Sequence, residues 1–115
     1  MRGVEPGLGS ALVRGGRLVA TIHKARVETV RVFYATMRGD LEALRNRIAR
    51  GDDVDGRDGS GLTPLMWACN RDHHECAEAL IGAGAAVDMV NNDGSTALML
   101  ACDFGHHECA QALMD

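Results

Sequence analysis

Apolar side chains recur at helical spacing in short blocks, and glycine-rich or acidic segments separate these blocks. In one block Leu65, Ala68 and Cys69 lie three and four positions apart, which places them on one face of a helix. A second block follows with the same kind of spacing, from Cys76 to Ile81. Isolated helices shorter than roughly 12–15 residues are marginal in water. The pattern therefore predicts pairs of short helices that bury their apolar faces against neighbouring pairs.

Residues that favour helix ends and turns flank these blocks. Thr63 followed by Pro64 predicts an N-cap and a proline in the first helical position. Gly84 stands where a helix would end in a left-handed conformation. The Asp93-Gly94 pair predicts a tight, hairpin-like turn. Each unit is thus interpreted as helix, turn, helix and hairpin-like connection.

The units repeat along the chain at a fixed interval. The stretch HHECAEAL at 73–80 returns as HHECAQAL at 106–113, an offset of 33 residues. The same offset aligns Gly61 with Gly94 without a gap, and it extends backward with weaker identity. Fixed periods of 20–50 residues are typical of solenoids, in which each unit packs only on its neighbours. We therefore predict stacked units of like structure.

These units resemble ankyrin repeats. The resemblance rests on three stretches: GLTPLMWACNRDHHECAEALIGAGAAVD (61–88), GSTALMLACDFGHHECAQALMD (94–115) and a diverged copy, YATMRGDLEALRNRIARGDDVDGRD (34–58). Four positions depart from the family pattern: Met66 and Met99 replace a histidine, Asp72 replaces a glycine, and Ala97 replaces a proline.

The resemblance implies an all-α fold, an ankyrin-repeat solenoid of stacked helix-turn-helix units joined by hairpin-like turns. We expect the repeat domain to cover residues 28–115, divided into 28–60, 61–93 and 94–115, with the last unit incomplete. Residues 1–27 match no repeat and form a basic leader. We expect that leader to be disordered, with a short helix near its end in which Leu18, Val19 and Ile22 would cover the first unit.

Charge is distributed unevenly. Residues 1–51 hold 10 basic and 4 acidic residues, whereas residues 52–115 hold 2 basic and 12 acidic residues. The acidic half would repel nucleic acid and anionic lipid and would attract a basic surface on a partner protein. No apolar run approaches the roughly 18–20 residues of a membrane-spanning helix. A cytoplasmic or nuclear location is expected, with mitochondrial import by the leader, residues 1–27, as an alternative.

The duplicated His-His-Glu-Cys motif suggests two kinds of chemistry. Zinc held by His73 or His74 with Cys76 and Cys69 is one hypothesis, and a Cys–His nucleophile is another. The Cys-x6-Cys spacing is not a known zinc signature, however. The family resemblance instead makes His73 and its repeat equivalent turn histidines. It also implies small core residues, and hence buried thiols, at Cys69, Cys76, Cys102 and Cys109.

Two further motifs lack a required residue. The segment GDDVDGRDGSG (51–61) resembles a calcium loop, but Leu62 or Leu65 stands where the closing glutamate should be. Its aspartates are expected to shape a turn between repeats. Both GLGSAL (7–12) and GAGAAV (82–87) lack the third glycine of a dinucleotide-binding loop. We therefore expect no cofactor, no metal, no small-molecule substrate and no catalysis.

The resemblance implies a non-catalytic protein–protein interaction module that binds its partner on the turn tips and the first-helix face. Phe104 would either anchor that partner or cover the open end of the stack, and Trp67 is expected to be partly buried packing. Two alternatives remain open: the targeting part of a larger enzyme or a ubiquitin-ligase adaptor, and a Cys/His metal-binding or redox-responsive module. Carried over position by position, the partner-binding residues are Met37, Arg38, Arg57, Leu62, Asn70, Arg71, Val90, Asn92, Ser95, Asp103 and Phe104, with Gly59, Ser60 and Asp93 beside them at the turn tips.

Overall fold

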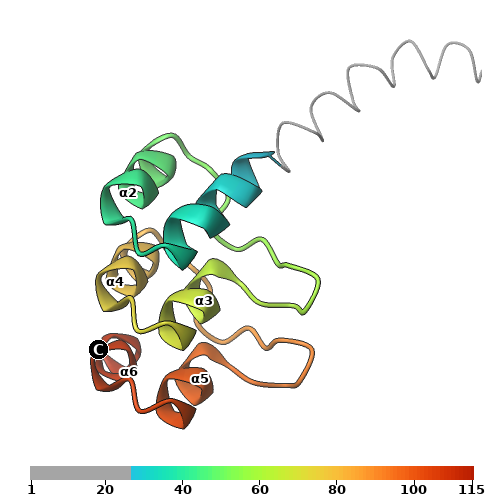
Figure 1. Cartoon of the computed structure of the whole chain (residues 1–115), viewed down its shortest axis with the longest axis vertical. Helices are drawn as coiled ribbons and strands as arrows, with labels where there is room; N and C mark the ends of the chain where they lie inside the picture. The colour runs from blue at the N-terminus through green and yellow to red at the C-terminus, as the bar shows by residue number, and fades with distance from the viewer. Residues whose placement is uncertain (1–26) are drawn as a thin grey trace, which may run out of the picture.

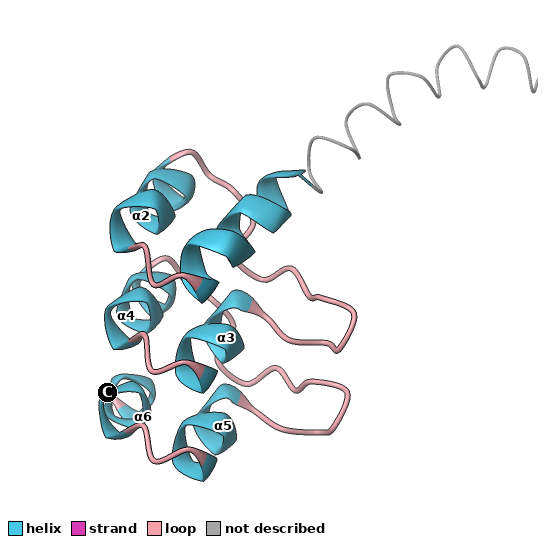
Figure 2. Cartoon of the chain, viewed as in Figure 1, coloured by secondary structure: helices cyan, strands magenta, loops and turns pink. Residues whose placement is uncertain are grey.

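The computed structural model describes residues 27–115, which form six short helices and no strand (Figure 1, Figure 2). The helices stack as three pairs, with the first helix of each pair in one column and the second in another (Figure 2). This arrangement confirms the predicted all-α solenoid. No helix of the described part is long and apolar enough to cross a membrane. In chain order the helices are 27–37, α2 (Leu41–Ala49), α3 (Pro64–Asn70), α4 (His74–Gly82), α5 (Ala97–Asp103) and α6 (His107–Met114).

The predicted leader lies outside the described residues apart from Val27, which is already helical. The short helix expected around Leu18, Val19 and Ile22 also falls outside them. Helix 27–37 therefore marks the start of the described stack, one residue before the predicted start of the repeat domain.

Side-chain caps begin the first helices of the second and third units. The Thr63 hydroxyl accepts a hydrogen bond from the Met66 backbone N–H at 3.2 Å, and Thr96 accepts one from Met99 at the same distance. Pro64 occupies the first turn of α3, where its missing N–H costs nothing. The predicted cap and proline position are therefore confirmed.

Backbone hydrogen bonds close the hairpin-like connections. Between the second and third units, the Asn91 N–H donates to the Ser95 carbonyl and the Gly94 N–H to the Asn91 carbonyl, both at 3.0 Å. Gly84 follows the end of α4 with a φ of +89°, a left-handed conformation that glycine adopts without a Cβ penalty. Both turn predictions are therefore confirmed.

The turn inside each helix pair has one residue in a left-handed backbone conformation. Gly39, Asp72 and Gly105 stand at equivalent positions with φ values of +68°, +61° and +70°. A side chain in this conformation costs roughly 1–2 kcal/mol, although Asp tolerates it better than most residues. At Gly39 an added Cβ would also lie 2.7 Å from the His73 ring. The middle unit thus carries strain that its two neighbours avoid.

Burial depends on which unit follows in the stack. Met66 is 1% exposed because α5 packs against α3, whereas its equivalent Met99 is 50% exposed. In the same way Cys69 is fully buried and its equivalent Cys102 is exposed. The prediction of four buried thiols is therefore wrong for Cys102, because no described helix covers that side of α5.

The acidic segment between the first two units is built from local hydrogen bonds. Asp53 accepts a hydrogen bond from the Asp55 N–H, and Asp55 accepts one from the Ala86 N–H of the next connection, both at 2.9 Å. Asp52 is buried and pairs with Arg47 at 3.5 Å. These carboxylates shape a turn between repeats, as the sequence predicts.

Candidate protein-interaction surface

One carboxylate organises the turn tip between the first two units. Asp58 Oδ1 accepts hydrogen bonds from the backbone N–H groups of Ser60 and Leu62, both at 2.9 Å. Asn91, 33 residues later, repeats the arrangement with the N–H groups two and four residues after it, also at 2.9 Å. Because both tips are tied at the same backbone positions, they project from the stack in the same way (Figure 2).

The two turn tips are also bonded to each other. The Asn92 backbone N–H donates to the Ser60 carbonyl at 3.0 Å, and the Asn92 side-chain amide donates to the Gly59 carbonyl at 3.2 Å. These bonds fix the spacing between adjacent tips. Asn92 therefore has a structural role in addition to its predicted role as a partner contact.

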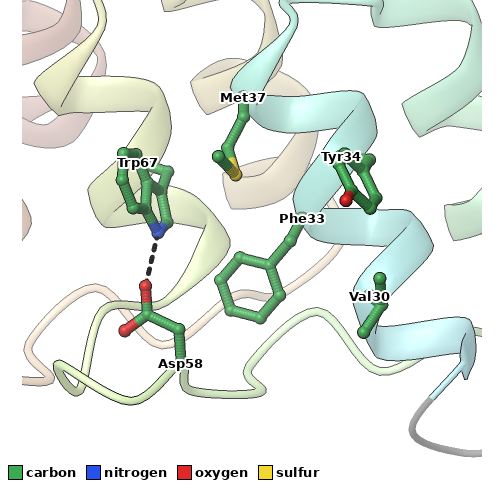
Figure 3. A pocket seen from close by; sticks show the side chains of 6 residues that line it. All are labelled: Val30, Phe33, Tyr34, Met37, Asp58 and Trp67. Atoms are coloured by element: carbon green, nitrogen blue, oxygen red, sulfur yellow. Dashed lines mark hydrogen bonds between the residues drawn. The ribbon is translucent and has the colours of Figure 1, made fainter.

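A groove lies between helix 27–37 and α3. It is mainly apolar and has a volume of about 290 Å³. Figure 3 shows the Phe33 ring pointing from its helix into the space beside Trp67 and Asp58. Half-open apolar hollows of this kind are typical of binding sites. The groove is lined by Val30, Phe33, Tyr34, Met37, Asp58 and Trp67.

Trp67 is held in place from two sides. Its indole Nε1–H donates to Asp58 Oδ2 at 2.8 Å (Figure 3). The Arg71 guanidinium carbon lies 5.2 Å from the centre of the Trp67 ring, within the range of a cation–π contact. Trp67 is only partly buried, as the sequence predicts, but it also forms one wall of the groove.

The predicted contact residues differ in exposure, and none is fully buried. Four are half-buried: Met37, Leu62, Asn70 and Ser95. The other seven are exposed: Arg38, Arg57, Arg71, Val90, Asn92, Asp103 and Phe104. The structure brings Met37 and Arg71 together around Trp67, whereas Leu62 packs partly against the core.

Two residues of helix 27–37 that line the groove, Val30 and Tyr34, were not among the contacts predicted from the sequence. Val30 is 48% exposed and Tyr34 is 61% exposed. A signal was available, because the offset of 33 places Tyr34 at the position of Trp67. Because the first copy is diverged, its sequence predicts contacts only at the end of its first helix and at the turn that follows.

Phe104 lies at the far end of the same helix column. It is 56% exposed and stacks on the His106 ring, with centroids 5.9 Å apart and planes at 26°. This contact orients the phenyl ring while leaving much of it accessible. Whether Phe104 anchors a partner stays a prediction.

The repeated histidines connect successive units. His73 Nε2 lies 3.2 Å from the Met37 carbonyl, and His106 Nδ1 lies 2.7 Å from the Cys69 carbonyl. In each case the ring reaches back 36 or 37 residues to the first helix of the preceding unit. The ring nitrogens are thus used for packing between units, as the turn-histidine interpretation predicts.

Three thiols belong to the interior. The pKa of Cys69 is raised to about 12, first by burial and then by the neighbouring Cys109 thiol. Burial also raises the pKa of Cys109 to about 11, with the Asp72 charge as the next cause. The pKa of Cys76 is raised as well, first by burial and then by Glu75. Protonated, buried thiols are poor nucleophiles and poor metal ligands.

No metal-like cluster appears within residues 27–115. In that part of the chain no three His, Cys, Asp or Glu side chains converge as ligands of an ion would. His74 instead lies 3.5 Å from Glu108. The surface with the features of a site is therefore the apolar groove with its adjoining turn tips.

Comparison with known proteins identifies the family. The profile of the ankyrin repeats, in three copies, matches residues 32–115. The chain belongs to the ankyrin-repeat family, whose members are generally protein–protein interaction modules and typically non-catalytic.

A curated relative is similar over part of the chain. The acyl-CoA-binding domain-containing protein 1 of Arabidopsis thaliana is 36% identical over 59 residues, which is 51% of this chain. The matched region spans 17% of that relative's length.

Proposed function

We propose that this chain is a non-catalytic module that binds another protein along its first helices and turn tips. The observation that carries the proposal is the apolar groove beside Trp67, on a domain whose family generally binds proteins. Exposed apolar surface bordered by polar residues is typical of interaction sites. Two of the predicted contacts support the same face, since Met37 lines the groove and Arg71 lies over Trp67.

The uneven charge of the chain supports a partner whose surface carries the complementary charge. The acidic half of the chain, residues 52–115, would face a basic patch on the partner and increase the rate of association. Asp103 and Asp93 are exposed and belong to this acidic half. We therefore propose that binding weakens as salt concentration rises.

Affinity capture from cell extract tests the proposal. Phe104→Ala and Arg71→Glu should each reduce the amount of captured partner relative to the wild-type chain. Arg45→Glu is a matched control, because Arg45 is exposed on α2, in the column of second helices. Unchanged capture by both test variants would reject this face. Failure of the wild-type chain to retain any protein specifically would reject the function.

A second candidate is that this repeat domain is the targeting part of a larger protein, such as an enzyme or a ubiquitin-ligase adaptor. The support is that a curated relative is much longer than the region it shares with this chain. Full-length transcript sequence would decide, because a reading frame that encodes no further domain would remove this candidate.

We also propose the cytosol or nucleus as the compartment, with mitochondrial import as the alternative. Free, protonated thiols packed in the core, such as Cys69, suit a reducing compartment. Imaging of the tagged chain beside a mitochondrial marker would separate the two.

A further inference from the structure

Tyr34 stands between two different surfaces. On one side it lines the apolar groove beside Trp67. On the other it lines a second hollow of about 280 Å³, together with Arg31 and Arg38. These two arginines lie three residues before and four residues after Tyr34. Arg38 follows the end of helix 27–37, and its backbone N–H donates to the Tyr34 carbonyl at 3.1 Å, so it continues the helix face that carries Arg31 and Tyr34. An apolar hollow and a basic hollow therefore adjoin across one exposed tyrosine.

The arginines of this basic hollow are available to a ligand. Arg31 and Arg38 are exposed, and neither forms an ion pair or side-chain hydrogen bond with any residue in the range 27–115. Arg47, which also lines the hollow and is half-buried, is already paired with Asp52 at 3.5 Å. Arg31 and Arg38 thus contribute unpaired positive charge.

The basic hollow keeps a net positive charge, because it is lined by Arg31, Arg38 and Arg47 but by only one carboxylate, Asp40, and Arg47 is paired with Asp52. Asp40 lines the basic hollow but caps α2, accepting a hydrogen bond from the Ala43 N–H at 3.1 Å. Asp58 lines the apolar groove, and its oxygens already accept three hydrogen bonds from the turn and from Trp67. Both acids are held in place by hydrogen bonds within the fold, whereas Arg31 and Arg38 are exposed and line the basic hollow. Charge complementarity therefore favours an acidic ligand here.

We propose that this double hollow binds an extended acidic peptide segment of the partner protein. One apolar side chain of the segment enters the groove beside Trp67 and packs on Tyr34. A carboxylate close to it in sequence lies between the guanidinium groups of Arg31 and Arg38, which favour planar carboxylates as hydrogen-bond partners. This inference rests on the proposed function and adds the chemistry of the segment that is recognised.

Selection from a phage-displayed library of random short peptides on the purified full chain provides the test. We expect enrichment of peptides that carry a Leu or Phe next to Asp or Glu. Enriched peptides are then synthesised with a fluorescent label, together with versions in which Lys replaces the acids, and their affinities are measured by anisotropy. Trp67 is the only tryptophan, so its emission reports directly on occupation of the groove.

Variants at Tyr34 and at the two arginines separate the apolar contribution to binding from the electrostatic one. Tyr34→Ala should weaken peptide binding by about 10-fold or more, because Tyr34 lines both hollows. A tenfold loss of affinity corresponds to about 1.4 kcal/mol of binding free energy. Arg31→Glu combined with Arg38→Glu should lose the acidic peptides and favour the Lys versions. Arg45→Glu, on α2, should bind like the wild type. Helicity measured by circular dichroism confirms that each variant is folded.

The outcomes distinguish this inference from the proposed function. Enrichment of basic peptides, of peptides without charge preference, or of no peptide at all would overturn the inference. So would wild-type affinity in the Tyr34→Ala variant. If Phe104→Ala and Arg71→Glu still abolish capture of the protein partner in those cases, the proposed function stands and only the recognised chemistry is wrong.

Discussion

The hydrogen bond between Asp58 and Trp67 links the turn tip to the groove, and a conservative substitution can isolate it. Asp58 Oδ1 accepts two backbone N–H groups, while Oδ2 accepts the indole N–H at 2.8 Å. Asp58→Asn keeps an acceptor for the backbone, as Asn91 does at the equivalent turn. It places an amide NH₂ against the indole N–H, so that two donors face each other.

The expected loss in the free energy of unfolding follows from the number of hydrogen bonds that each substitution removes. A hydrogen bond to a charged group contributes about 1.5–3 kcal/mol, and partial exposure of this pair lowers that to roughly 1–2 kcal/mol for Asp58→Asn. Asp58→Ala removes all three bonds and should cost about 2–4 kcal/mol. Asn91→Ala removes only two neutral bonds and should cost about 1–2 kcal/mol. The free energy of unfolding should therefore fall most in Asp58→Ala.

Urea unfolding, followed by circular dichroism and by Trp67 emission, measures both the loss of stability and the change in the surroundings of the indole. Asp58→Asn should lower the midpoint and shift the native-state emission of Trp67, because the indole loses its partner. Asn91→Ala should lower the midpoint without altering that emission, since it lies at the other turn. If Asp58→Asn matches the wild type in both midpoint and emission, the Asp58 carboxylate does not hold the indole in place.

Three further predictions concern the stack itself. Asp72→Gly should raise the free energy of unfolding by about 0.5–1 kcal/mol, because left-handed strain of roughly 1–2 kcal/mol exceeds the entropic cost of glycine; a lower urea midpoint would show that the carboxylate is needed. Met66→Ala should cost about 2–5 kcal/mol and the exposed Met99→Ala less than about 1 kcal/mol, and equal costs in thermal melts would contradict the stacking order. The folded-state pKa values of Cys69 and Cys109, raised to about 12 and about 11, exceed their ordinary value of about 9. Stability should therefore be complete below about pH 9 and decline as the pH rises through 11, and a Cys69→Ala, Cys109→Ala double variant that declines equally would refute this cause.

The sequence by itself determines the unit and its period. Thr63 and Pro64 begin a helix, Gly84 ends one, and Asp93-Gly94 closes a turn, because each acts on backbone within a few residues. The offset of 33 then requires that equivalent residues occupy equivalent places in successive units. The fold class and the roles of His73 and the acidic turn could therefore be predicted from local chemistry and repetition.

Only the tertiary structure decides which of two equivalent residues is covered. Cys69 and Cys102 have nearly identical sequence surroundings, yet one is buried and the other exposed, because burial depends on the unit packed alongside. The groove likewise requires helix 27–37, which carries Phe33 and Tyr34, to lie beside Trp67 of the adjacent unit (Figure 3). Its shape is set by helix packing between segments 33 residues apart, which local sequence patterns do not specify.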